Sequence, residues 1–357
     1  MSVNNRYQAL DGIRGIAALM VVFYHYSLKL FDPAGMLANN FFVHTSYVFV
    51  DFFFVLSGFV IAANYWGKIT SIKAFKTFTI KRFARLYPLL LVTVLIFVGL
   101  KIYGMLFTNF NFDTKDYGFN DVLIETLEPL TFLNSTPLIS KNAGMNPVSW
   151  FISAQMISYF VFALTILFFP KRIWPFIILI LLCISFIIFY KRYLYTSDYG
   201  FVRGILNFSC GVLIFKCFDR YKRLSIHRLE IPFTLLLILA FALIYYSKTE
   251  LTHLILPILF SLGVYIFAYE RGVISKLLKL KSMQYLGRIS YSIYLNHFIV
   301  LWIFYHVSWN LLKINPTKAY SKLGLFIVVL LVIATSAVTY QWIELRGGKW
   351  IKRKMLK

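Results

Sequence analysis

An arginine and a histidine lie within the first long apolar segment of the chain, where ionisable side chains are costly and usually functional. Arg14 and His25 are eleven residues apart in DGIRGIAALMVVFYH. In an α-helix this spacing turns through about 1100°, so both side chains share a face, with His25 roughly 16 Å further along the axis. An imidazole can act as a base or a nucleophile, so this stripe could line a channel. The alternative is a snorkelling arginine and a histidine bonded to a neighbouring helix.

The second apolar segment, FVDFFFVLSGFVIAANYW, carries Asp51 near one end and Ser57 with Gly58 near its middle. Short connections favour neighbouring helices, which would bring Asp51 to the depth of His25. We predict that Asp51 bonds to His25, fixes its tautomer and raises its basicity. The alternative is an aspartate that reaches outer water or caps its helix. Ser57 and Gly58 indicate either close helix packing or a ligand contact.

A cationic cluster opens the third apolar segment in KRFARLYP. Arg82 and Arg85 are three residues apart and share a helix face, next to Lys81. Guanidinium groups bind phosphate through paired hydrogen bonds. The cluster could equally be a signal for membrane topology, but Arg14 at a similar depth on another segment favours an anion site.

The ninth and tenth apolar segments add further polar groups. Tyr294 and His297 share a helix face in GRISYSIYLNHFIV. They are candidates either for substrate binding or for hydrogen bonds between helices. Glu344 ends the tenth segment and is expected to pair with an arginine on the inner side. No cluster with metal-ligand spacing is found in the sequence, so we predict no metal site.

Composition predicts the elements that position these residues. The 357-residue chain is 59% hydrophobic and only 14% charged. A soluble protein of this size could not bury so much apolar surface. This composition excludes a soluble enzyme, a disordered chain and a nucleic-acid-binding domain. Long unbroken apolar runs also argue against a β-barrel, whose strands alternate. We predict an all-α, polytopic transmembrane helical bundle.

Ten apolar windows are long enough to span a bilayer. They are 12–31, 46–66, 83–107, 148–169, 173–190, 201–218, 229–247, 251–269, 284–306 and 323–343. With the N-terminus inside, the inner segments hold 26 of the 37 Lys and Arg but only 5 of the 14 Asp and Glu. The positive-inside rule then predicts that both termini are cytoplasmic. We expect a single domain over 1–357, with an outer loop at 108–147 and a basic cytoplasmic tail at 344–357.

The chain resembles the acyltransferase-3 family of integral membrane acyltransferases over essentially its whole length. Five motifs carry the resemblance in family order: DGIRGIAALMVVFYH, VDFFFVLSGF, KRFARLYP, SYSIYLNH and YQWIELRGGKW. The resemblance implies a bacterial cytoplasmic (inner) membrane protein that transfers an acyl group, commonly acetyl. The donor would be cytoplasmic acyl-coenzyme A, and the acceptor a hydroxyl of an extracytoplasmic carbohydrate such as a surface polysaccharide.

The resemblance also implies roles for individual residues. His25 resembles the catalytic histidine, with Arg14 as its partner in the motif. Arg82 and Arg85 resemble the basic motif associated with the donor. Family members often carry Glu where this chain has Gln155, so an acidic role there does not carry over. Some members continue into an extracytoplasmic domain, whereas this chain stops at Lys357.

Two schemes and one rival function follow. Coenzyme A is expected at Arg14, Lys81, Arg82 and Arg85, with His25 acting either as a general base or as a nucleophile that carries the acyl group. The rival is a transporter or flippase of a lipid-linked sugar or small metabolite. We expect acyl-coenzyme A, a carbohydrate acceptor and membrane lipids as partners, with self-association left open. No permanently bound cofactor and no nucleic acid are expected.

Overall fold

The computed structural model describes residues 6–28, 32, 35–37, 39–107, 118–140, 144–221, 226–314 and 317–356. Regular secondary structure in these ranges is helical, and they contain no strand. Ten helices coincide with the ten predicted windows. They are α1 (Gln8–Tyr26), α3 (Phe49–Tyr65), α4 (Ile72–Phe107), α6 (Trp150–Phe168), α7 (Trp174–Tyr190), α8 (Gly200–Arg220), α9 (Glu230–Tyr246), α10 (Ile255–Phe267), α12 (Lys281–Tyr305) and α13 (Lys318–Thr339).

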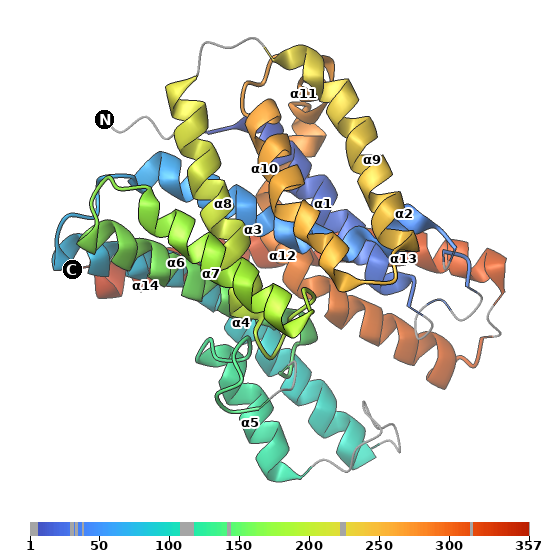
Figure 1. The fold of residues 1–357 in the computed structure, drawn as a ribbon. Helices are drawn as coiled ribbons and strands as arrows, with labels where there is room; N and C mark the ends of the chain where they lie inside the picture. The colour runs from blue at the N-terminus through green and yellow to red at the C-terminus, as the bar shows by residue number, and fades with distance from the viewer. Residues whose placement is uncertain are drawn as a thin grey trace.

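Shorter helices connect or cap these ten. They are α2 (Phe41–His44), α5 (Phe119–Leu130), α11 (Val273–Leu278) and α14 (Arg346–Met355), with short 3₁₀ turns before α3, α6, α9 and α10. Two π-helical turns, His306–Leu311 and Tyr340–Leu345, follow α12 and α13. Figure 1 shows α1, α3 and α12 running through the middle of the bundle, with α8 and α10 packed over them.

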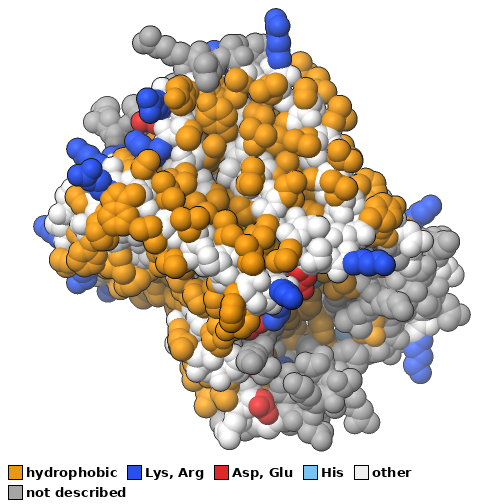
Figure 2. Space-filling view, in the orientation of Figure 1, with side chains coloured by type: hydrophobic (Ala, Val, Ile, Leu, Met, Phe, Trp, Pro, Cys, Tyr) orange, Lys and Arg blue, Asp and Glu red, His pale blue; other side chains and the backbone are white. Residues whose placement is uncertain are grey.

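The outer surface of the bundle is apolar. In the described part of the chain, six helical stretches are long and apolar enough to cross a membrane, and α7 and α9 are shorter apolar helices. Figure 2 shows hydrophobic side chains spread over the face formed by α7 to α10, with Lys and Arg gathered near its margins. Leu182 on α7 is 62% exposed, and Leu235 on α9 is 63% exposed. Water would not tolerate so large an apolar patch, so the fold is a polytopic helical membrane bundle, as predicted.

Glycines allow the central helices to approach closely. At the crossing of α3 and α8, a Cβ added to Gly58 would lie 2.0 Å from the Phe208 carbonyl oxygen. A Cβ added to Gly211 would likewise lie 2.0 Å from the Val55 carbonyl oxygen. α1 crosses α12 in the same way, since a Cβ on Gly287 would lie 2.2 Å from the Asp11 carbonyl oxygen. The packing interpretation of Gly58 is therefore confirmed.

The segment predicted as a basic tail is helical over most of its described residues. The chain remains helical from α13 through the π turn into α14, which packs against α4. A Cβ on Gly348 would lie 2.6 Å from the Ala84 carbonyl oxygen, and one on Gly347 would lie 2.7 Å from the Pro88 side chain. The two glycines thus seat α14 on the turn of α4 that carries Arg85.

The segment predicted as an outer loop is described in part. Residues 108–117 and 141–143 lie outside the described ranges. In the remainder, α5 lies along the C-terminal half of α4, and the two project from the rest of the bundle (Figure 1). Lys101 on α4 pairs with Glu125 on α5 at 3.4 Å.

We predict that Gly211→Ala destabilises the bundle, because the new methyl group would force α3 and α8 apart. The expected loss is about 1–3 kcal/mol, the usual cost of overpacking. Thermal unfolding of the purified protein in detergent measures it. Gly99→Ala on α4 is the matched control, because no atom lies within 4 Å of the position that a Cβ would take there. Equal unfolding temperatures for the two variants would show that the crossing tolerates a side chain.

Candidate active site

A cavity of about 840 Å³ opens at the end of the bundle where α1 and α12 begin and α3 ends. We call it the cationic cavity. Its lining includes seven basic side chains and one carboxylate, Asp11. The basic residues are Arg6, Arg14, Lys68, Lys81, Arg82, Arg85 and Arg288. The structure therefore brings Arg14, Lys81, Arg82 and Arg85 together around one space, from two helices far apart in sequence.

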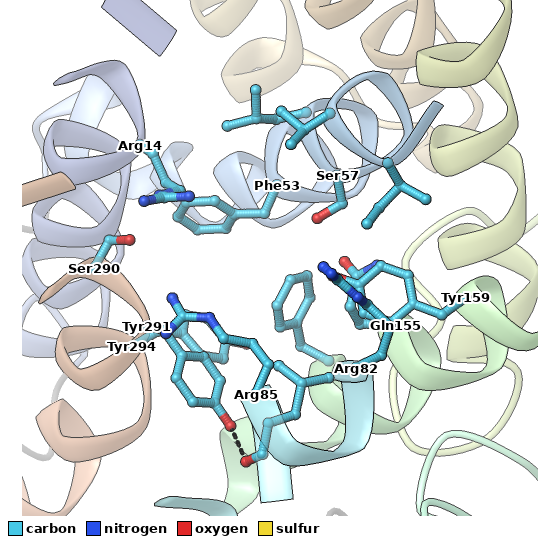
Figure 3. Close-up of a pocket in the computed structure, with 15 residues that line it drawn as sticks. Arg14, Phe53, Ser57, Arg82, Arg85, Gln155, Tyr159, Ser290, Tyr291 and Tyr294 are labelled. Carbon is cyan, nitrogen blue, oxygen red and sulfur yellow. Dashed lines mark hydrogen bonds between the residues drawn. The ribbon is translucent and has the colours of Figure 1, made fainter. Parts of the chain in front are cut away.

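A second cavity of about 170 Å³, the inner chamber, adjoins the cationic cavity. The two share Arg14, Arg82 and Arg85 among their lining residues. Figure 3 shows the side chains that point into the inner chamber. Those that belong to it alone include Phe53, Ser57, Phe151, Gln155, Tyr159, Ser290, Tyr291 and Tyr294. Ser57 thus faces the chamber while its neighbour Gly58 packs against α8.

Two of the three shared arginines have anionic partners. Arg14 pairs with Asp11 at 3.3 Å and donates to the Gly287 carbonyl oxygen through Nε and Nη2, at 3.1 and 2.6 Å. Arg85 forms an ion pair with Glu344, which is 2% exposed and lies in the π turn. The predicted pairing of Glu344 with an inner-side arginine is confirmed. These two guanidinium groups are partly neutralised before any ligand arrives.

Arg82 differs from both. Its Nη2 donates to the Tyr65 hydroxyl at 3.0 Å, and its guanidinium lies over the rings of Tyr65 and Tyr159 at 5.2 and 5.9 Å. Within the described residues it has no carboxylate partner. Aromatic rings hold the side chain in place without neutralising it. Arg82 is therefore the shared cation best prepared to receive an anion.

Two histidines meet beyond the deep end of the inner chamber. His297 Nδ1 lies 2.7 Å from the Tyr294 carbonyl oxygen, so this nitrogen carries a proton and donates it. His297 Nε2 lies 3.2 Å from His25 Nδ1, which also lies 3.0 Å from the Val21 carbonyl oxygen. For neutral rings, His25 Nδ1 must then be the donor to both acceptors.

This assignment leaves Nε2 of His25 as the unprotonated nitrogen. No hydrogen bond to it is found in the part of the chain that the structure describes. His297 is fully buried, whereas His25 is only partly buried, between Tyr24 and Phe298. His297 therefore acts on His25 as an orienting partner, a role that sequence spacing alone left open.

Tyr294 lies beside both the inner chamber and the histidine pair. Tyr294 lines the chamber, donates to the Val148 carbonyl oxygen at 3.2 Å, and lies 5.8 Å from the His297 ring. His25 is not among the residues that line either cavity. On the predicted stripe of α1, Arg14 thus lines both cavities, whereas His25 lines neither.

The predicted pairing of Asp51 with His25 is wrong. Asp51 is fully buried and accepts from Arg203 on α8, at 2.7 and 2.6 Å, and from Asn207 at 3.0 Å. Arg203 is 3% exposed and lies over the Trp150 ring. A bidentate guanidinium neutralises the carboxylate more completely than an imidazole could. Arg203 could have been noticed as a basic residue inside an apolar window, although sequence cannot say which carboxylate it meets.

Within the described ranges, no three His, Cys, Asp or Glu side chains come together as metal ligands would. Free cysteines are Cys183, Cys210 and Cys217. The cationic cavity is the place where a polyanionic substrate fits.

We predict that Asp51→Asn acts on stability, because it leaves the Arg203 charge buried with neutral partners only. The expected loss is about 3–5 kcal/mol in unfolding free energy. The double variant Asp51→Leu with Arg203→Leu should recover much of it, because neither charge is then buried alone. Thermal unfolding of the single and double variants measures both effects. A stable Asp51→Asn protein with an altered pH profile of activity would instead support contact with His25.

Comparison with known proteins supports one family. No solved structure matches the chain. A curated protein of Rhizobium radiobacter, "Protein 2 in picA locus", is 46% identical over 87 residues, which cover 24% of this chain and 40% of that protein. The match thus spans less than half of that relative. A family model described as an acyltransferase domain matches residues 7–341, nearly the whole chain, and the chain therefore belongs to the acyltransferase-3 family.

Proposed function

We propose that the protein is a membrane O-acyltransferase. It moves an acyl group, by default acetyl, from cytoplasmic acyl-coenzyme A to a hydroxyl of a carbohydrate on the outer side, such as a surface polysaccharide. The observation that carries the proposal is the cationic cavity, which shares three arginines with the inner chamber, together with the histidine pair beside Tyr294 of that chamber. The protein acts in the cytoplasmic membrane of a bacterium.

The donor suits the cationic cavity electrostatically. Coenzyme A carries a 3′-phosphate and a diphosphate at one end and the reactive thioester at the other. Seven basic side chains around one carboxylate raise the local concentration of such a polyanion. Arg82, which has no carboxylate partner among the described residues, offers a guanidinium fork for a phosphate. The thioester end then enters the inner chamber.

His25 acts as a general base through Nε2. It takes the proton from the acceptor hydroxyl, whose oxygen forms a bond to the thioester carbonyl carbon. The carbon–sulfur bond breaks, and the departing thiolate takes the proton from the imidazolium. His297 supports this step because its Nε2 accepts from His25 Nδ1–H and so stabilises the charge that develops on the ring.

Transfer requires that the thioester pass Tyr294, whose ring lines the inner chamber and lies 5.8 Å from the His297 ring. The acceptor approaches His25, which is only partly buried, from the outer side. Donor and acceptor thus occupy one complex at the moment of transfer.

We predict that His25→Ala reduces acyl transfer by a factor of about 10²–10⁴, the usual contribution of a general base. Mass spectrometry of surface polysaccharides from cells carrying each variant measures their O-acetyl content. His44→Ala is the matched control, because His44 is exposed on α2, where it packs on the Tyr245 ring. Undiminished O-acetylation in His25→Ala cells would refute the proposed role. If labelled acetyl-coenzyme A leaves label on His25 in the absence of an acceptor, then His25 is an acyl carrier and not a general base.

We also predict that Arg82→Gln raises the KM for acetyl-coenzyme A by a factor of about ten or more, because one charge-assisted contact to phosphate is lost. Thiol release from acetyl-coenzyme A in membranes containing the polysaccharide measures it. Arg172→Gln removes an exposed arginine outside both cavities and should leave KM unchanged. A transporter would release no thiol from the donor in any variant.

A further inference from the structure

The inner chamber contains buried polar atoms that the protein itself does not satisfy. Gln155 on α6 is 2% exposed, and neither its Oε1 nor its Nε2 has a hydrogen-bond partner among the described residues. The Nε of Arg82 is also buried and unpaired there. Leaving such a group unpaired is costly, so nearly all buried polar groups in proteins are paired. Three unpaired atoms around one chamber indicate a ligand with matching groups.

The three atoms specify the kind of group that would satisfy them. Gln155 Nε2 and Arg82 Nε donate, whereas Gln155 Oε1 accepts. The Ser57 hydroxyl, on the opposite helix, makes no hydrogen bond within the described ranges and lines the same chamber (Figure 3). The rings of Phe53 and Phe151 form apolar wall between them. A ligand with N–H donors, carbonyl acceptors and methylene groups fits this lining, whereas a phosphate supplies no donor and an acyl chain supplies little polarity.

The order of the cavities restricts the ligand further. Arg82 lines both cavities, whereas Gln155 and Tyr294 line the inner chamber alone. A molecule held by its phosphates in the cationic cavity therefore passes Arg82 before it reaches Gln155. In coenzyme A, the segment between the diphosphate and the sulfur is the pantetheine arm. This arm consists of two secondary amides joined and flanked by carbon chains.

We propose that Gln155 binds the pantetheine arm of the donor, with Nε2 donating to an amide carbonyl and Oε1 accepting from an amide N–H. The inference rests on the proposed function, since it takes acyl-coenzyme A as the donor. It assigns Gln155 a binding role that needs a carboxamide. A carboxylate at this position would accept hydrogen bonds and could not donate them.

Binding of two ligands to the purified protein in detergent tests the proposal. Coenzyme A contains the arm, whereas adenosine 3′,5′-bisphosphate keeps only the nucleotide end. Gln155→Met keeps the length of the side chain and removes its polar atoms. It should weaken the binding of coenzyme A about tenfold and leave the affinity for the bisphosphate unchanged. Thr165→Val, further along α6, removes a hydroxyl that donates to the Val161 carbonyl oxygen of its own helix and should alter neither affinity.

Stability provides the second measurement. A carboxamide without a partner in the protein is not needed for folding, so the unfolding temperature of Gln155→Met should equal or exceed that of the native protein. A Gln155→Met protein that fails to fold would overturn the proposal by making Gln155 structural.

Other outcomes separate this inference from the proposed function. If Gln155→Met binds coenzyme A with unchanged affinity, the binding role of Gln155 is overturned but the proposed function is not. The Gln155 carboxamide then has water as its hydrogen-bond partner. An equal loss of affinity for both ligands would place Gln155 at the nucleotide end of coenzyme A and overturn its contact with the pantetheine arm. A native protein that binds neither ligand would overturn the proposed function, and this inference with it.

Discussion

The structure depends on one constraint, that a charge inside an apolar bundle must have a partner. Where the partner is part of the protein, the pair joins helices. Asp51 and Arg203 join α3 to α8, and Arg85 with Glu344 joins α4 to the π turn after α13. Among the described residues, Arg82 has no carboxylate partner and its Nε is unpaired, and the Gln155 carboxamide has no hydrogen-bond partner. The same physical cost that makes the paired groups structural makes the unpaired groups candidates for ligand binding.

Close helix packing brings these groups to one place. Glycines at the α3–α8 and α1–α12 crossings remove the side chains that would hold the backbones apart. Ser57, next to Gly58 on α3, consequently faces the inner chamber at the level where α4 presents Arg82. Gly347 and Gly348 likewise let α14 approach α4 closely. This contact fixes the π turn and the Glu344 carboxylate against α4. The chamber is thus defined by backbone contacts that lie close in the sequence to its polar lining.

The two histidines show how one hydrogen bond prepares another. The Tyr294 carbonyl oxygen holds the proton of His297 on Nδ1, and this leaves Nε2 to accept from His25. His25, which is only partly buried, then has an unprotonated Nε2. Because Tyr294 also lines the chamber, one residue of α12 contributes both to the tautomer of the pair and to the wall of the cavity.

The sequence by itself determined the membrane bundle, the ten helices and the stripe of Arg14 and His25, because hydrophobic length and helical periodicity are local properties. It also brought Arg82 and Arg85 together, since a spacing of three is enough to share a face. The partners of Asp51 and His25 were decided only by the tertiary structure. Arg203 lies 152 residues after Asp51, and His297 lies 272 residues after His25. Which helices become neighbours depends on the packing of whole faces, and no spacing within one helix contains that information.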